Sequence, residues 1–310
     1  MRPPSVPEAL RHIVAREVPI APLTTWGVGG SAETMLVPRD AGEARNALKW
    51  LADTRSSYFV LGGGSNVLVA DEGTTLPLIH TIGMDRFRVR VDAETVYIDC
   101  GAGLPLRRAL ALSLREGWSG LEFAAGIPGT VGGALLGNAG SRYGEIGEVV
   151  ERLQGVDSAG DFFEIDGKDV SWGYRSSSVE GRGWFVCAVT LRLRASTPSA
   201  VRERIAEVLE GRKSQPTGRR TAGCVFKNPE GDSAGRLLDA AGCKGLAIGG
   251  ASVSRTHANF IESEPGCMAR DILRLISLCR TRVREVFGIT LLREVKAIGI
   301  PEDLWNEGFA

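Results

Sequence analysis

The sequence has few of the residues that hold metal ions or form disulfides. Its three histidines, His12, His80 and His257, do not have the spacing of metal ligands. The six cysteines are dispersed and form no CxxC pair. No secretory signal is recognisable, so we expect reduced thiols, no metal site and a cytoplasmic protein.

Net charge and uninterrupted apolar runs are also lacking. The 37 lysines and arginines balance 37 aspartates and glutamates, which argues against a protein that binds nucleic acid or a membrane surface. The longest apolar region, 121–140, is interrupted by Glu122, Pro128 and many glycines, unlike a membrane helix. We therefore expect neither a nucleic-acid partner nor membrane insertion.

Glycine, in contrast, is abundant and clustered. The 40 glycines gather at 27–30, 62–64, 126–140 and 242–250 without forming low-complexity sequence. Such clusters are typical of tight turns and of places where the backbone approaches another group closely.

Hydrophobic periodicity predicts helices and strands in irregular alternation. Helical patterns cover 7–17, 41–53, 104–116, 200–212 and 269–287, and Gly117 ends the third of these as a C-cap would. A short apolar strand is expected at 58–61, and residues 86–99 alternate as a half-buried strand pair should. The fold class is therefore α+β or mixed α/β, and 196–199 is the best candidate for a boundary between two units.

The segment Leu61–Asn66, LGGGSN, follows an apolar strand directly. Consecutive residues without side chains allow backbone N–H groups to converge on an anion, and Ser65 and Asn66 add polar side chains. The segment lacks both the GxGxxG spacing and the GK[ST] of a P-loop. On its own it is equally well explained as a phosphate cradle or as an ordinary loop.

A second segment, AGIPGTVGGA at 125–134, continues to Asn138-Ala139-Gly140. Its apolar, glycine-dense backbone suits a large flat ligand such as a flavin with its pyrophosphate, while the alternative is a helix start packed closely on a sheet. Two such segments together favour a dinucleotide cofactor. A third, around Trp26, is more typical of a core anchor.

Seven motifs in order resemble the UDP-N-acetylenolpyruvoylglucosamine reductase family. They are TTWGVGG, LGGGSNVLV, GLEFAAGIPGTVGGALLGNAG, YRSS, AGCVFKNP, VSRTHANFI and REV, and they run from about Leu23 to Gly299. No single motif is specific, but seven in order over most of the chain are.

The resemblance implies a vanillyl-alcohol-oxidase-type FAD fold of α+β class. The expected division is an FAD-binding region at 1–197, with subdomains at about 1–70 and 71–197, then a substrate-binding domain at 198–288. A C-terminal segment at 289–310 is expected to return toward the FAD-binding region. Because the stretch between Arg175 and Trp184 is short, the chain resembles the family branch without an extra tyrosine-bearing loop.

The implied reaction reduces the enolpyruvyl ether of UDP-N-acetylglucosamine to UDP-N-acetylmuramate in peptidoglycan precursor synthesis. It uses non-covalent FAD, with NADPH as co-substrate, and its partners are small molecules. The residues expected to bind the cofactor are Gly62, Gly63, Gly64, Ser65, Asn66, Ile127, Pro128, Gly129, Thr130, Gly132, Gly133, Gly140 and Val186.

Three residues match the family's catalytic positions. Arg175 fits a cation that binds the substrate carboxylate in bidentate fashion. Cys224 stands where the usual motif, SAGSVFKNP, has a serine that protonates the substrate carbon; a thiol is the more acidic donor, whereas the alternative is a structural cysteine with the role lost. Glu294 matches the last catalytic residue, although Leu291-Leu292-Arg293 replaces the usual Leu-Glu-Pro before it.

Further polar residues are expected near the substrate or in the framework. The substrate-binding candidates are Tyr174, Arg175, Lys227 and Asn228. His257 and Asn259 are interpreted as structural. A basic cluster at 212–220 either meets the substrate diphosphate or forms a solvated face.

Two other functions remain open at this stage. One is a different flavoenzyme of the same fold that oxidises a sugar or a hydroxy acid. Many such enzymes attach FAD through histidine, and no histidine lies in the two FAD-loop motifs. The other is an inactive flavin-binding protein, and the only feature that supports it is Cys224 in place of the family's serine.

Overall fold

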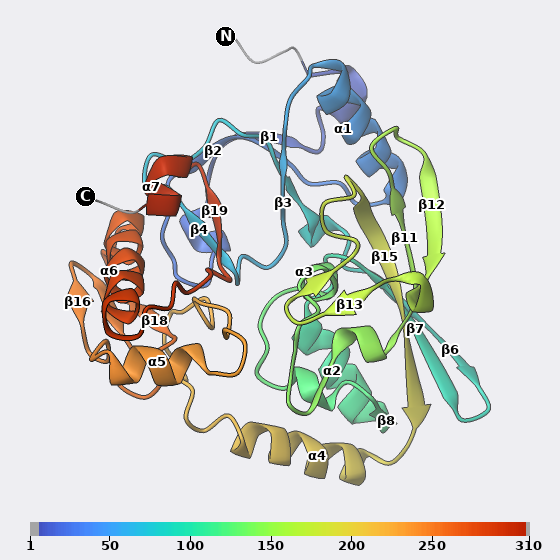
Figure 1. The fold of residues 1–310 in the computed structure, drawn as a ribbon. Helices are drawn as coiled ribbons and strands as arrows, with labels where there is room; N and C mark the ends of the chain where they lie inside the picture. Colours follow the sequence, from blue (N-terminus) through green and yellow to red (C-terminus); the bar gives the residue numbers. More distant parts are fainter. Residues whose placement is uncertain (1–5, 308–310) are drawn as a thin grey trace. The chain divides into compact units, whose positions relative to one another are not determined.

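The computed structural model describes residues 6–307, and the chain forms two compact units (Figure 1). The first comprises Met1–Ala15, Met35–Gly63 and Pro77–Arg212, and the second comprises Arg16–Thr34, Gly64–Leu76 and Lys213–Ala310. Strands β1 (Val14–Pro19) and β2 (Ser31–Leu36) each include residues of both units. The expected three-part division stays a prediction, and its residues 1–5 and 308–310 lie outside the described residues.

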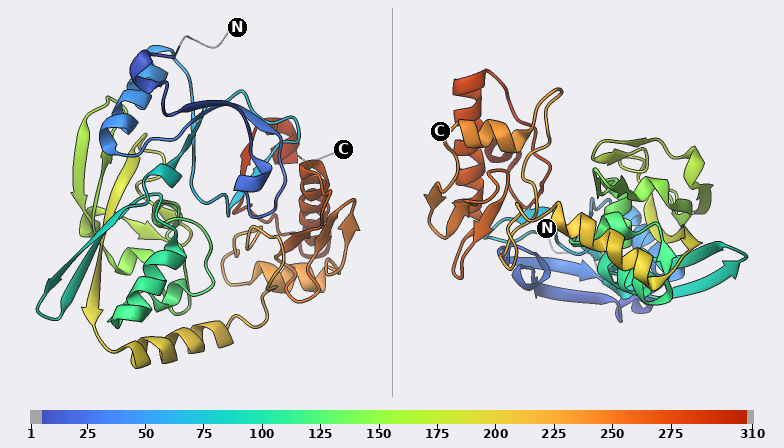
Figure 2. Two further views of the ribbon diagram at one scale, coloured as in Figure 1. Left: turned by 180° about the vertical axis from the view of Figure 1, so that it is seen from behind. Right: turned by 90° about the horizontal axis from the view of Figure 1, so that it is seen from below.

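The first unit contains an antiparallel sheet with strand order β12-β11-β15-β7-β6, and β8 pairs with β15. Figure 2 shows the long strands β7 and β15 side by side. Met35 and Leu36 of β2 pair in parallel with β5, which also pairs with β3. The strands are β3 (Phe59–Leu61), β5 (Leu78–His80), β6 (Phe87–Asp92), β7 (Thr95–Gly101), β8 (Trp118–Ser119), β9 (Gly140–Ser141), β10 (Gly144–Glu145), β11 (Val150–Val156), β12 (Phe162–Asp166), β13 (Trp172–Gly173), β14 (Ser176–Ser177) and β15 (Phe185–Ala195).

Helices of the first unit follow local signals closely. The α-helices are α1 (Ala41–Asp53), α2 (Leu106–Glu116), α3 (Val131–Leu136) and α4 (Pro198–Glu210), and the 3-10 helices are η1 (Glu8–Leu10), η3 (Thr81–Gly83), η4 (Glu122–Ala124), η5 (Ile146–Glu148) and η6 (Gly167–Asp169). The side chain of Asp40 caps α1 by accepting from the Glu43 N–H. Gly117 ends α2 in the left-handed conformation, as predicted. The strand pair predicted at 86–99 is confirmed as β6 and β7.

The helix predicted at 7–17 is wrong. Only η1 is helical there, and β1 begins at Val14. The Val37 N–H donates to the Ile13 carbonyl, and Ile13 is buried in the core against α1. Tertiary pairing and burial therefore override the weak helical pattern of this short segment.

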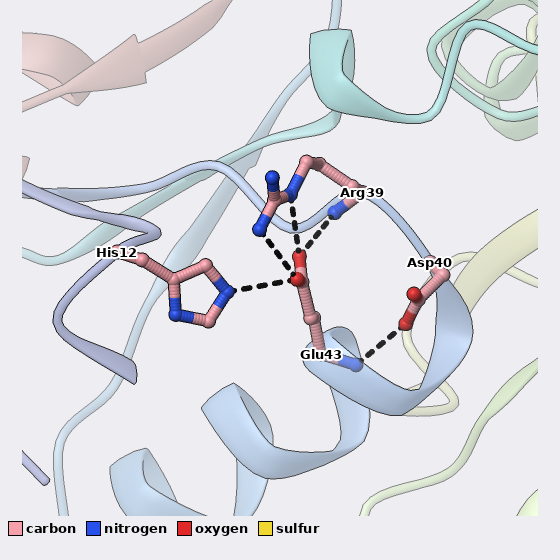
Figure 3. A network of polar contacts seen from close by, with 4 residues as sticks. All are labelled: His12, Arg39, Asp40 and Glu43. Carbon is pink, nitrogen blue, oxygen red and sulfur yellow. Dashed lines mark hydrogen bonds and ion pairs between the residues drawn. The ribbon is translucent and has the colours of Figure 1, made fainter. Parts of the chain in front are cut away.

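A polar network fastens the segment after η1 to α1 (Figure 3). Glu43 of α1 contacts His12 through Oε1 at 2.8 Å, and Arg39 donates to both of its carboxylate oxygens. Burial opposes ionisation of Glu43, but hydrogen bonds from Arg39 and His12 outweigh it and lower the pKa to about 2. The carboxylate therefore stays charged at neutral pH and holds both partners.

The second unit is an α+β assembly with its own core. Its helices are η2 (Ala21–Leu23), α5 (Ala234–Ala240), α6 (Ala269–Phe287) and α7 (Glu302–Glu307), and its strands are β4 (Val67–Val69), β16 (Ala247–Ile248), β17 (Ala251–Val253), β18 (Ile261–Ser263) and β19 (Lys296–Ile298). Strands β16, β17 and β18 form an antiparallel sheet, and β19 pairs with β4 in parallel. The helix predicted at 269–287 is confirmed at both ends by α6.

Trp26 is a core anchor of the second unit, as the sequence indicated. It is 1% exposed, belongs to the same core as the buried face of α6, and donates its indole N–H to the Ile261 carbonyl at 2.8 Å. The predicted α+β class is confirmed by both units. Among residues 6–307, no helix is long and apolar enough to cross a membrane.

Candidate functional site

The two glycine-rich loops of the first unit lie directly against each other. A Cβ added to Gly62 would meet the Thr130 hydroxyl at 2.8 Å, and one added to Gly63 would meet the Gly129 Cα at 2.8 Å. Any side chain at 62 or 63 would therefore push the loops apart. The sequence predicted both loops separately, and the structure brings them together.

The loop at 126–133 is fastened by backbone hydrogen bonds. Val131 and Gly132 donate to the carbonyls of Leu104 and Ala102 at 2.9 and 2.8 Å, and the Leu106 N–H donates back to Gly129 at 3.0 Å. Gly129 has a φ of +106°, a backbone conformation that side-chain-bearing residues rarely adopt. Thr130 is buried and accepts from the Gly133 N–H. These contacts hold the loop rigidly, while Pro128 is exposed.

The other predicted cofactor residues have different environments. Gly64 has a φ of +60°, and a Cβ there would lie 1.9 Å from the Leu23 carbonyl oxygen. Gly140 lies in the β9–β10 hairpin, Val186 is buried in β15, and Ile127 packs on the core of the first unit. Ser65 is half-buried.

The residues at 62–63 and 129–130 fit an FAD-type cofactor. Half-buried backbone without side chains lies on two adjoining loops, both held by other parts of the unit. Both loops are rich in glycine, and such backbone suits a flat ring system with a diphosphate. Because these loops lack side chains at the glycine positions, a charged side chain introduced at one of them should prevent cofactor binding.

His80 lies beside the first glycine loop and introduces a pH dependence. It is 7% exposed and forms a hydrogen bond with the backbone of Gly62. Burial lowers its pKa below the ordinary value of 6.5 and outweighs the opposing effect of this bond. His80 is therefore neutral at pH 7.

We expect the protein to lose stability as the pH falls below about 6.5, the pKa of an unfolded histidine. In that range the unfolded chain binds more protons than the folded chain, so acidification favours unfolding. Urea unfolding at about pH 7.5 and 5.5 measures the loss, and His80→Gln should reduce it. An equal pH dependence in His80→Gln would show that His80 does not contribute.

Tyr174 and Arg175 form the two-residue tip of the β13–β14 hairpin. Trp172 pairs with Ser177 and Gly173 with Ser176, which leaves the tip between them. Arg175 has a φ of +52°, uncommon for a residue with a side chain, and such strain is concentrated at functional sites. Its guanidinium lies 5.2 Å from the centre of the Tyr174 ring, and Tyr174 is 53% exposed. The hairpin therefore presents both side chains together.

Two buried polar residues hold this hairpin on the end of α3. Asn138 is fully buried, donates to the Gly173 carbonyl at 3.1 Å and accepts from the Gly147 N–H. Ser177 donates to the Leu136 carbonyl at 3.0 Å. Asn138 and Ser177 lie in two of the family-like motifs, but the sequence gave no sign that they join them. The Arg175 hairpin is thus tied to the glycine-rich segment.

In the second unit, Cys224 and Glu294 lie on segments that share a backbone clamp. Cys224 bridges to Phe260, the Val225 N–H donates to the Asn259 carbonyl, and the Glu294 N–H donates to the Val225 carbonyl at 2.8 Å. Val225 therefore connects the segment of Cys224 to the segment of Glu294. The two predicted catalytic residues therefore lie on adjoining backbone segments.

Asn66 has a role that its motif did not reveal. It was predicted to bind the cofactor, and the structure shows its side chain donating to the Glu294 carbonyl at 3.1 Å. Its own carbonyl accepts from the Lys296 N–H at 3.1 Å. Asn66 therefore fixes the backbone on both sides of Val295, and cofactor binding by its side chain stays a prediction.

Asn259 holds the Cys224 segment through a buried side chain, which supports its interpretation as structural. Its amide accepts from the Phe226 N–H at 2.9 Å and donates to the Phe226 carbonyl at 2.8 Å. The residue is 2% exposed. Its amide therefore satisfies both backbone groups of Phe226 in place of a strand partner.

Asn259→Ala is expected to destabilise the protein by about 2–4 kcal/mol, because two buried backbone groups lose their partners. Urea unfolding measures the change, with Asn306→Ala as control because the Asn306 side chain is exposed. A loss no larger than that of the control would contradict the clamp.

Lys227 and Asn228 follow directly after the clamp. The Lys227 N–H donates to the Leu292 carbonyl, and the Asn228 side chain accepts from the Ala234 N–H at the start of α5. The Asn228 side chain thus satisfies a backbone N–H at the start of α5. Substrate binding by Lys227 or Asn228 stays a prediction. Within the basic cluster, Arg219 forms ion pairs with Glu262 and Glu264.

The chain is similar to known proteins over most of its length. Residues 215–298 match the family described as UDP-N-acetylenolpyruvoylglucosamine reductase, C-terminal domain, and residues 32–166 match an FAD binding domain. The UDP-N-acetylenolpyruvoylglucosamine reductase of Syntrophobacter fumaroxidans is 38% identical over 93% of this chain and 85% of its own length. That of a Bradyrhizobium species is 38% identical over 94% of each chain.

A solved structure agrees. The crystal structure of UDP-N-acetylenolpyruvylglucosamine reductase from Thermus caldophilus matches with a TM-score of 0.79 and 36% identity, over 92% of this chain and 98% of that one. The predicted FAD-binding fold is thereby confirmed. The chain belongs to the UDP-N-acetylenolpyruvoylglucosamine reductase family.

Proposed function

We propose that this protein reduces the enolpyruvyl ether of UDP-N-acetylglucosamine to UDP-N-acetylmuramate with NADPH, through non-covalently bound FAD. The family membership supports this activity. The observation that carries it is the clamp around Val225, which holds the segments of Cys224 and Glu294 as neighbours. An acid and a carboxylate on adjoining backbone suit a reaction that ends in protonation of carbon.

FAD held by the two glycine-rich loops would supply hydride transfer from NADPH to the terminal vinyl carbon of the substrate. Negative charge then develops on the neighbouring carbon and its carboxylate. Arg175 is proposed to bind this carboxylate, because a guanidinium offers two parallel N–H donors and keeps its charge. The hairpin tip presents Arg175 beside Tyr174, which is the second candidate for substrate contact.

Cys224 is proposed to donate its Sγ proton to the substrate carbon that carries the carboxylate. The residue is a half-buried thiol outside any disulfide. Glu294 is proposed to assist this transfer or to orient the substrate carboxylate group. The Glu294 N–H donates to the Val225 carbonyl, and the Glu294 carbonyl accepts from the Asn66 side chain. The backbone of Glu294 is therefore positioned by contacts that do not involve its own side chain.

The biological setting is part of the same proposal. The product is a precursor of peptidoglycan, and its substrate and NADPH are small molecules. None of the six cysteines forms a disulfide, which supports the cytoplasmic location predicted from the sequence.

Anaerobic spectroscopy of the purified holoprotein tests this function against its alternatives. NADPH should bleach the flavin absorbance, and the enolpyruvyl substrate alone should restore it without oxygen. A hexose or a hydroxy acid that bleaches the flavin would instead identify an oxidase of the same fold. Bleaching by NADPH without recovery would identify an inactive flavin-binding protein.

A further inference from the structure

The C-terminal half of α6 presents four polar residues on one face. Ser277, Arg280, Thr281 and Arg284 recur at the spacing that aligns side chains along a helix. Together with Thr290 and Arg293 they line a cavity of about 40 Å³ within the second unit. We call this cavity the α6 arginine pocket.

The pocket gathers positive charge, and the described side chains supply no counterion to it. Three of its six lining residues are arginines, and none is acidic. Among the side chains of residues 6–306, no carboxylate forms an ion pair with Arg280, Arg284 or Arg293. Three guanidinium groups around one small cavity repel one another unless an anion lies between them.

Several donors that border the pocket are buried without an acceptor. Arg280 Nε, Arg293 Nε, Arg293 Nη2 and the Ser277 hydroxyl have no hydrogen-bond partner within the described structure. Buried donors of this kind are rare in native proteins and costly when left unmet. Their number at one cavity indicates a missing acceptor with several oxygens.

Contacts with α7 fix how two of the arginines are oriented. Arg280 Nη1 donates to the Asn306 carbonyl at 2.6 Å, and the Arg293 guanidinium lies 4.7 Å from the centre of the Trp305 ring. Burial, followed by the charge of Arg280, lowers the pKa of Arg293 to about 10. Arg293 is therefore still protonated at neutral pH, although in an environment unfavourable to its charge.

We propose that the α6 arginine pocket binds one phosphate-type oxyanion. A buried water needs roughly 10–15 Å³ of such volume, so the pocket accommodates one small tetrahedral anion but no nucleoside. Guanidinium groups recognise such oxygens in bidentate fashion.

Isothermal titration of inorganic phosphate into the holoprotein tests the proposal, with ionic strength held constant by chloride. We expect one phosphate per chain. Arg293→Gln and Arg280→Gln should each weaken binding at least about tenfold, the loss typical of a charge-assisted contact. Arg270→Gln is the matched control, because Arg270 is exposed at the other end of α6 and should leave binding unchanged.

Two further measurements make the test decisive. Glycerol 3-phosphate that competes with phosphate would show that the site accepts phosphate esters, and failure to compete would restrict it to the free ion. Phosphate should raise the Tm of the wild-type protein, whereas Arg293→Gln should show no rise. The proposal is overturned if phosphate does not bind, or if Arg293→Gln binds it as tightly as the wild-type protein.

Discussion

Cys224→Ala is expected to separate the two halves of the catalytic cycle. Reduction of the bound flavin by NADPH should proceed at nearly the wild-type rate, because Cys224 takes no part in it. Reoxidation by the enolpyruvyl substrate should slow by roughly 10²–10⁴-fold, the usual contribution of a general acid. Anaerobic stopped-flow absorbance of each half-reaction measures both rates.

Cys224→Ser is the matched control for this result. The hydroxyl restores the donor that the family usually has at this position, so substantial reoxidation should return. Alkylation of the wild-type thiol should also abolish reoxidation, and substrate should protect against it. Unchanged reoxidation in Cys224→Ala would show that Glu294 or a water supplies the proton.

Gly129→Asp is expected to abolish FAD retention. Gly129 has a φ of +106°, which residues with a side chain rarely adopt, and its Cα would lie only 2.8 Å from a Cβ on Gly63 of the adjoining loop. The aspartate would also place negative charge beside the diphosphate of the cofactor. Absorbance of the purified variant measures the flavin content per chain.

Gly181→Asp provides the control for backbone strain. Gly181 also has a positive φ, of +85°, but a Cβ there would meet no atom within 4 Å. This variant should retain flavin despite similar strain. A folded Gly129→Asp protein with full flavin content would show that the loop at 126–133 does not bind the cofactor.

Local signals explain why much of the fold was predictable. Helices α1 and α6 begin and end where the periodicity predicted, because capping and an apolar face agree in both. The strand pair at β6 and β7 follows its alternating pattern. The helix predicted at 7–17 failed because the segment is short, and burial of Ile13 against α1 decides its conformation.

The candidate site residues could be proposed from the sequence, but the side chains that hold their segments in place could not. The glycine loops, Arg175, Cys224 and Glu294 stand out through motifs. The polar side chains that hold them, Asn66 and Asn138, act on backbone 228 and 35 residues away along the chain. No local pattern predicts such contacts, because the residues around an asparagine in the sequence do not indicate which distant backbone group its side chain will reach.

The chemical identity of the product tests the central claim most directly. Purified holoprotein, NADPH and UDP-N-acetylglucosamine enolpyruvyl ether should be incubated without oxygen, and the products analysed by mass spectrometry. The account predicts UDP-N-acetylmuramate, heavier than the substrate by the mass of one hydrogen molecule, in equal amount to the NADPH consumed. NADPH consumption without this product, or an unchanged substrate, would contradict it.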